Sequence, residues 1–120
     1  MIVGSWQMNY KELTVWKKSM DFVDKIYALA SVFPPEERFG LWSQITRAAV
    51  SVPANIAEGS GRATPKDFLK FLGVARGSLY EVSTQLQIAE RRSYCTVSED
   101  LKSLINEIAR MLTRMLNRKA

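Results

Sequence analysis

The chain has 120 residues, of which 47% are hydrophobic and 24% are charged, and this is enough for one domain with one buried core. It contains no histidine, the commonest general base and metal ligand, and its single cysteine, Cys95, can form no intrachain disulfide. Ser-His-Asp and Cys-His catalysis are therefore excluded and no Walker-type glycine loop is present, so we predict a protein that is not an enzyme and uses no metal or cofactor.

The formal net charge is +5, and the excess lies in the second half of the sequence. Residues 61–120 hold eleven of the 17 basic side chains but only six of the 12 acidic ones. This imbalance favours an acidic partner, with nucleic acid first, although many soluble bacterial proteins are mildly basic without one. No uncharged apolar stretch approaches the roughly 20 residues that span a bilayer, and no signal peptide is apparent. We therefore expect a cytoplasmic protein with no membrane partner.

Residues 1–10 show no hydrophobic periodicity, so we interpret them as a lead-in and residues 11–120 as one helical domain. A first helix is predicted over about residues 11–32 and ends before Pro34, because a proline disfavours the helical region for the residue before it. This helix carries a second apolar stripe beside the first, which is more apolar surface than one bundle contact needs. The second stripe consists of Trp16, Met20, Val23, Tyr27 and Ala30.

The second helix is predicted from Pro35 to about Glu58, since proline and acidic residues suit a first turn. The glycines at 59 and 61 then predict a left-handed cap at its end. Pro53 lies in the interior of this helix, where a proline costs about 3 kcal/mol or more, and we expect a bend there.

A third helix is predicted from Thr64, an N-cap followed by Pro65, to about Arg91. A fourth follows Ser98, another N-cap, and carries a strong apolar stripe. Short connections join the helices, and no segment alternates as a strand does. We therefore predict an all-α fold, an antiparallel up-down-up-down four-helix bundle whose second helix is kinked at Pro53.

Polar side chains recur at helical spacing beside the apolar stripe of the second helix. Arg47 lies in the small, apolar run ITRAAVSV, so we expect it to be partly buried and paired with a carboxylate. Two interpretations remain open: a fixed binding surface, or a polar network that sets helix register or joins subunits. The candidate network comprises Gln44, Arg47, Ser51, Asn55 and Glu58 on the second helix and Arg76, Ser78 and Glu81 on the third.

A hydrolase that uses Glu58 and Glu81 as acid and base is a further interpretation. It is disfavoured, because a pair of catalytic carboxylates needs an open pocket and the neighbouring arginines are simpler partners in salt bridges.

Binding to phosphate requires clustered cations, and Arg62 lies just before Lys66 and Lys70, which are one helical turn apart. Tyr80 and Tyr94 are the aromatic residues that could stack on single-stranded bases. No helix-turn-helix, RRM or KH motif is present. The candidate nucleic-acid-binding residues are Arg62, Lys66, Lys70, Arg91, Arg92, Arg110, Arg114 and Arg118, with Arg76 and Lys119 as further cations.

The sequence also contains three runs with specific motifs: LTVWKKSMDFVDKIYALASVFPPEE, FGLWSQITRAAVSVPANIAEGSGR and FLKFLGVARGSLYEVSTQLQIAERRSY. Together these runs, from about Tyr10 to Tyr94, resemble a bacterial family of four-helix-bundle proteins. The family includes proteins encoded within intervening sequences of 23S ribosomal RNA genes and the accessory variability determinant of diversity-generating retroelements. Four features are jointly specific for it: the VW near the start, the FP-E turn, and the QxxRAAVSxPxNIAEG and ARGSxxE motifs.

The resemblance implies a ring-shaped homopentamer without known catalytic activity. For the retroelement members it implies binding to nucleic acid and to a reverse transcriptase, but the net charge of this chain is modest beside theirs, which favours the intervening-sequence type. The family motifs place Arg47, Asn55, Glu58, Arg62, Arg76 and Glu81 at characteristic polar positions.

We therefore expect a homo-oligomer, with a pentamer favoured, that associates with RNA or DNA through a basic surface. The alternatives are a structural or protein-interaction module with no nucleic-acid role, and an accessory subunit of a reverse transcriptase.

Overall fold

The structure is a computed structural model that describes residues 9–118. Within that range it contains four α-helices, two single-turn 3-10 helices and no strand, which confirms the predicted all-α fold. The lead-in predicted for residues 1–10 lies almost wholly outside the described residues. The elements are η1 (Tyr10–Glu12), α1 (Thr14–Ala30), η2 (Pro35–Glu37), α2 (Leu41–Ser60), α3 (Pro65–Arg91) and α4 (Glu99–Asn117).

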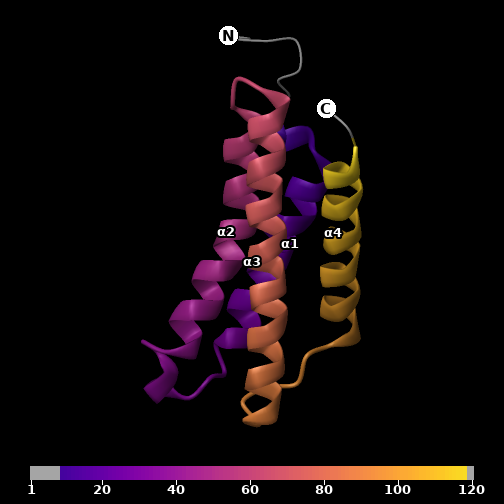
Figure 1. Cartoon of the computed structure of the whole chain (residues 1–120). Helices are drawn as coiled ribbons and strands as arrows, with labels where there is room; N and C mark the ends of the chain where they lie inside the picture. Colours follow the sequence, from indigo (N-terminus) through magenta and orange to yellow (C-terminus); the bar gives the residue numbers. More distant parts are fainter. Residues whose placement is uncertain (1–8, 119–120) are drawn as a thin grey trace.

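Successive helices run in opposite directions and pack around one core (Figure 1). Each helix packs on two neighbours, in the order α1, α2, α3, α4 and back to α1, and α2 and α3 share the most extensive interface. The bundle measures 48 × 25 × 19 Å. Its radius of gyration is 15.3 Å, whereas about 14 Å is usual for a compact chain of this length. The bundle is therefore elongated, and its helices expose long outer surfaces.

The core is built from the apolar stripes that the sequence predicts on all four helices. Complete burial of one such side chain stabilises the fold by about 1.5–3 kcal/mol, so these stripes hold the bundle together. The largest fully buried side chains include Phe22 and Ile26 on α1, Ile45 and Ile56 on α2, Leu72 and Leu79 on α3, and Ile108 and Leu112 on α4.

The second apolar stripe on α1 is covered more fully than we predicted. Ala30 is buried, and Trp16 and Val23 pack against the core. Only Met20 and Tyr27 are exposed, at 42% and 44%. The chain itself supplies the cover, because Tyr10 of η1 meets Trp16 edge-on at 5.2 Å and Trp42 of α2 meets Tyr27 at 6.2 Å between ring centroids.

The start of α2 lies at Leu41, six residues later than predicted. Residues Pro35–Glu37 form one 3-10 turn instead, and the N–H of Leu41 donates a hydrogen bond to Oε1 of Glu37 at 2.9 Å. The Tyr94 hydroxyl donates to Oε2 of the same carboxylate at 2.8 Å. A carboxylate therefore caps α2 and ties its beginning to the segment after α3. Gly40 fits this cap because a Cβ there would lie 2.7 Å from Oε1 of Glu37.

These contacts shift the pKa values of both partners. The hydrogen bond from the Leu41 N–H, then the one from the Tyr94 hydroxyl and to a lesser extent the charge of Arg92 lower the pKa of Glu37, while desolvation opposes them. The bond to Glu37, desolvation and the negative charge of Glu37 raise the pKa of Tyr94.

The left-handed glycine cap that we predicted at the end of α2 is wrong. Gly61 has φ −92 and ψ 0, and no described glycine has a positive φ. Gly59 has a packing role instead, because a Cβ there would lie 2.7 Å from Cβ of Phe71 and 3.1 Å from Cδ1 of Phe68. Glycine at position 59 therefore lets α2 and α3 approach closely.

The left-handed residue of the described chain is Ser93, with φ 60, and it ends α3. The N–H of Ser93 donates to the carbonyl of Glu90, and the N–H of Tyr94 donates to that of Ala89, both at 2.9 Å. This pair of bonds is a Schellman motif with serine in the position where glycine is usual.

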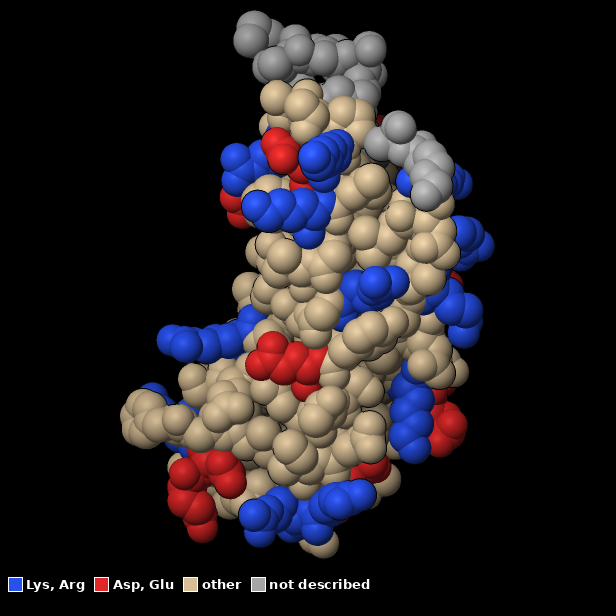
Figure 2. Space-filling model, viewed as in Figure 1, with Lys and Arg blue, Asp and Glu red and all other residues tan. Residues whose placement is uncertain are grey.

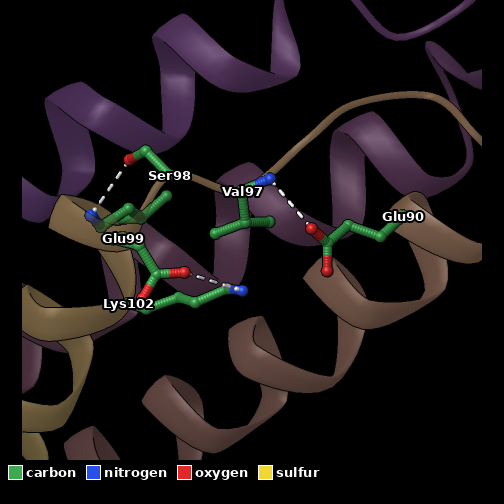
Figure 3. A network of polar contacts seen from close by, with 6 residues as sticks. Glu90, Val97, Ser98, Glu99 and Lys102 are labelled. Carbon is green, nitrogen blue, oxygen red and sulfur yellow. Dashed lines mark hydrogen bonds and ion pairs between the residues drawn. The ribbon is translucent and has the colours of Figure 1, made fainter.

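The predicted N-caps of α3 and α4 are confirmed. Oγ1 of Thr64 accepts a hydrogen bond from the N–H of Asp67 at 3.2 Å, and Oγ of Ser98 accepts one from the N–H of Leu101 at 3.1 Å. The segment before α4 is also fixed by Glu90, whose Oε2 accepts from the N–H of Val97 at 3.0 Å (Figure 3).

Pro53 is buried inside α2 and has no N–H to donate to the carbonyl of Ala49. Figure 1 shows α2 close against α3 at the end that contains Ser60 and diverging from it toward Leu41. This divergence agrees with the bend that we predict at Pro53.

Candidate nucleic-acid interface

The structure brings together only part of the predicted polar network. Oγ of Ser78 on α3 donates to Oγ of Ser51 on α2 at 2.9 Å. Nδ2 of Asn55 donates to the carbonyl of Ser51 at 2.7 Å and to its Oγ at 2.8 Å. These three half-buried side chains link the two helices at mid-height, as expected of a network that sets helix register.

The prediction that Arg47 is partly buried and paired with a carboxylate is wrong for the single chain. Arg47 is exposed and forms no ion pair within the described residues. Its neighbours Ala48 and Ala49 are buried, and Arg47 therefore projects from the opposite side of the helix. Gln44, one turn earlier, is exposed as well.

The other members of the network have local partners. Oε2 of Glu58 pairs with Nη2 of Arg62 at 2.7 Å, and the guanidinium of Arg62 also lies 4.7 Å from the ring centroid of Phe71. Oε2 of Glu81 accepts from Nε2 of Gln85 at 3.3 Å. Both carboxylates are exposed, and no described hollow is lined by the two together, as an acid–base pair would require.

The described charges divide the bundle into two unequal halves. The contacts of Ser51 with Ser78 and of Arg76 with Thr113 show which levels of the helices lie side by side. We define the basic half as residues 9–14, 51–78 and 111–118, and the neutral half as residues 15–50 and 79–110. The basic half holds seven basic and three acidic residues, and the neutral half holds nine of each. The positive excess of the described chain therefore lies entirely in the basic half.

All eight candidate nucleic-acid-binding residues are exposed, but they do not form one surface. Arg91 and Arg92 end α3 in the neutral half, about 37 Å from Lys66 at a rise of about 1.5 Å per residue. Figure 2 shows Lys and Arg side chains near the two ends of the molecule and along the α4 edge, around a centre with few charges. The basic half contains Arg62, Lys66, Lys70, Arg114 and Arg118, and Arg110 lies one turn below Arg114 at its border.

A hollow of about 470 Å³ lies between α3 and α4, and no acidic residue lines it. Arg110 and Arg114 line it from α4, and Tyr80, which is 51% exposed, lines it from α3. Nη1 of Arg76 donates to Oγ1 of Thr113, a residue of the lining, at 3.2 Å. All of these residues except Thr113 were candidates from the sequence, but nothing in the sequence places them together.

A second hollow, of about 550 Å³, lies between α4 and α1, and its lining is mainly acidic. Nζ of Lys18 lies 3.1 Å from Oε2 of Glu107, one of the lining residues. Helix α4 thus separates a basic hollow from an acidic one. The acidic lining residues are Asp21, Asp24, Asp100 and Glu107.

Comparison of the sequence with known protein families identifies the family of this chain. The profile of the family described as 23S rRNA-intervening sequence protein matches residues 11–114. The chain belongs to this family. The match confirms the resemblance seen in the sequence and extends it into α4.

A crystal structure of a protein of unknown function from the S23 ribosomal protein family of Bacteroides thetaiotaomicron is similar to this family member. The two share 28% sequence identity with a TM-score of 0.75, over 88% of this chain and all of the other. No curated protein sequence matches the chain.

Two further features bear on what this family member can do. Among residues 9–118, no three histidine, cysteine or acidic side chains group as a metal site, and no helix has the length and apolarity needed to cross a membrane. Desolvation, followed by the charge of Glu90, raises the pKa of the half-buried Cys95 thiol, which disfavours the reactive thiolate.

Phe39 is 90% exposed, and we did not predict this from the sequence. The guanidinium of the preceding residue, Arg38, lies 5.6 Å from the centroid of the Phe39 ring. Arg38, Pro35 and Trp42 line an apolar hollow of about 270 Å³ at this end of the bundle. The phenylalanine directly before Gly40 was the available signal, but we interpreted this segment only as part of the second helix and of a family motif.

Proposed function

We propose that this member of the 23S rRNA-intervening sequence protein family is a cytoplasmic, non-enzymatic, homo-oligomeric protein that associates with nucleic acid. The observation that carries the proposal is the concentration of the positive excess in the basic half. Clustered, exposed cations attract phosphates and release counterions on binding, and this gives affinity without a dedicated motif. The description of the family, which refers to ribosomal RNA, favours RNA over other polyanions.

Binding of a structured RNA by the intact chain at several salt concentrations tests this function. The informative variant replaces Lys66, Lys70 and Arg118 in the basic half by glutamine. The matched control makes the same change at Arg38, Arg91 and Arg92, which are also exposed and lie in the neutral half.

We expect the basic-half variant to bind at least tenfold more weakly at low salt and with a shallower dependence on salt, because it loses up to three phosphate contacts. The control should keep most of its affinity. Absence of binding at low salt, or equal losses in the two variants, would contradict the proposal.

Self-association, with a pentamer favoured, is the second part of the proposal. Gly73 and Gly77 support it, because a Cβ added at either position would meet no atom within 4 Å in the single chain. Glycine inside a helix costs about 0.5–1 kcal/mol relative to alanine, so two of them on an outer surface need another reason. Close approach of a second copy would supply it, and the exposed Val74 between them fits such a contact.

The oligomeric mass in solution tests this second part. Light scattering should give a single species of several chains, and Gly73→Leu together with Gly77→Leu should shift it toward monomer while the helical content is retained. A monomeric wild-type protein would contradict it.

A protein-interaction module without a nucleic-acid role is the alternative function that a specific observation favours. Phe39 is the most exposed large hydrophobic residue described, and it lies beside an apolar hollow. A protein partner captured through this surface, including a reverse transcriptase, should survive nuclease treatment and be lost in Phe39→Ala. Loss of the partner on nuclease treatment would favour the nucleic-acid role.

A further inference from the structure

Tyr80 differs from the other tyrosines of the chain. The ring of Tyr10 pairs with Trp16 at 5.2 Å, and that of Tyr27 pairs with Trp42 at 6.2 Å. The Tyr94 hydroxyl bonds Glu37, and its ring lies 5.8 Å from that of Phe33.

In the described chain, by contrast, the Tyr80 side chain has neither a ring partner nor a hydrogen-bond partner, and half of its surface is exposed. An aromatic face is therefore left open at the middle of α3.

The cations beside Tyr80 are also unneutralised. Arg110 and Arg114 are exposed, lie one turn apart on the same face of α4, and form no ion pair within residues 9–118. The acidic residue best placed on α4 to pair with Arg110 is Glu107, three residues earlier, but Lys18 of α1 holds its carboxylate at 3.1 Å. The hollow therefore presents two free guanidinium groups next to a free aromatic face.

The neutral polar side chains of Thr113 and Asn117 complete the lining of this hollow. The amide of Asn117 can donate and accept hydrogen bonds, as the edge of a nucleobase requires. Oγ1 of Thr113 accepts a hydrogen bond from Nη1 of Arg76 at 3.2 Å. This bond brings a third guanidinium group next to the hollow.

This combination of groups matches an unpaired nucleotide. Single-stranded nucleic acids are bound by aromatic side chains that stack on bases and by cations that follow the backbone. In a duplex the base faces are already covered by their neighbours, so an open tyrosine ring gains nothing there.

We propose that the hollow between α3 and α4 binds single-stranded nucleic acid, with a base stacked on Tyr80 and its flanking phosphates held by Arg110 and Arg114. The inference rests on the proposed association with nucleic acid and narrows it to unpaired strands and to one site.

Fluorescence anisotropy with labelled twelve-nucleotide RNA and DNA strands, and with an RNA duplex of the same length, tests the inference. Tyr80→Ala should weaken single-strand binding between about 5- and 150-fold, the range that loss of one base–aromatic stack gives. The slope of affinity against salt should stay unchanged, because no phosphate contact is lost. Tyr80→Phe should bind as the wild type does, and duplex binding should change little.

Two further variants separate stacking from charge. Arg110→Gln combined with Arg114→Gln should weaken binding and reduce the salt slope for a single strand by about 1.4. Tyr27→Ala removes a tyrosine of similar exposure on α1 and should leave affinity unchanged.

Photocrosslinking with a 5-iodouracil strand should label the peptide that contains Tyr80.

The outcomes distinguish this inference from the proposed function. If Tyr80→Ala binds single strands as the wild type does while the Lys66, Lys70 and Arg118 variant loses affinity, the site is wrong but the association with nucleic acid stands. Equal weakening of single strands and duplex by Tyr80→Ala would also overturn the site. Absence of binding to all three probes would contradict both the inferred site and the proposed association with nucleic acid. The relative affinity of the RNA and DNA strands identifies which of them the site prefers.

Discussion

The side of α3 that faces α2 is closed, whereas the side that faces α4 opens into a hollow. On the closed side, Gly59 lets the helices approach to contact distance, and a serine pair at 2.9 Å joins them. On the open side, Tyr80 and two arginines of α4 remain without partners in the described chain. The contrast teaches that one helix can supply stability through one surface and remain available for binding through another.

The largest expected effect on stability is a difference between two adjacent residues of α3, Leu79 and Tyr80. Leu79 is fully buried, so Leu79→Ala should lower the free energy of unfolding by about 2–5 kcal/mol. Tyr80 faces the hollow, and Tyr80→Ala should change the free energy by no more than about 0.5 kcal/mol. Urea unfolding followed by circular dichroism measures both, and similar losses would show that Tyr80 is part of the packing.

The next effect compares two glycines. Gly59→Ala places a Cβ 2.7 Å from Cβ of Phe71, an atom fixed to the backbone, so α2 and α3 must separate at a cost of about 1–3 kcal/mol. Gly77→Ala meets no atom within 4 Å in the single chain, so it should raise the stability of the monomer by up to about 1 kcal/mol. Thermal unfolding at equal protein concentration provides the measurement. A stabilised Gly59→Ala would show that the closed side is looser than described.

The carboxylate cap of α2 predicts a dependence of stability on pH. The pKa of Glu37 is lowered from 4.5 in the folded chain, chiefly by the Leu41 N–H and then by the Tyr94 hydroxyl. A group whose pKa is lower when folded stabilises the protein above its unfolded pKa, and that stability is lost as the pH falls through the folded value. Wild-type stability should therefore fall more steeply below about pH 4.5 than that of Glu37→Gln. Parallel pH profiles would contradict the cap.

The smallest expected effect concerns Arg47. An arginine buried against a carboxylate would cost about 3–5 kcal/mol on replacement by alanine. Because Arg47 is exposed and forms no ion pair within the described chain, Arg47→Ala should change the stability of the monomer by no more than about 0.5 kcal/mol. A larger loss that depends on protein concentration would place Arg47 at a contact between copies.

The sequence predicted the features of the fold that depend on nearby residues. The caps at Thr64 and Ser98 and the apolar stripes of the four helices act within a few residues, so composition and spacing reveal them. The cap of α2 was missed because Glu37 works with Tyr94, 57 residues away. The left-handed glycine cap predicted after α2 is wrong because Phe68 and Phe71 on the facing helix, and not the local sequence, determine the role of Gly59.

The residues of the candidate site could be predicted from the sequence, but their grouping in one hollow could not. Tyr80, Arg110 and Arg114 were each singled out, yet their shared hollow depends on how α3 and α4 pack. Arg47 was misplaced because its small neighbours in sequence suggested burial, whereas the side of the helix on which a residue lies decides this. Arg91 and Arg92 belong to the opposite end of the bundle, which a list of cations along the chain cannot show.

The position of α4 between an acidic and a basic hollow has a consequence for how a polyanion would approach. A helix with its side chains is about 10–12 Å across, which is close to the Debye length of about 8 Å at physiological ionic strength. At that salt concentration the electrostatic field of each hollow acts only on its own side of α4. A negatively charged chain is therefore attracted to the basic hollow and repelled by the acidic one. In very dilute salt the Debye length reaches about 30 Å, the two fields overlap, and this orienting influence fades even as the general attraction grows.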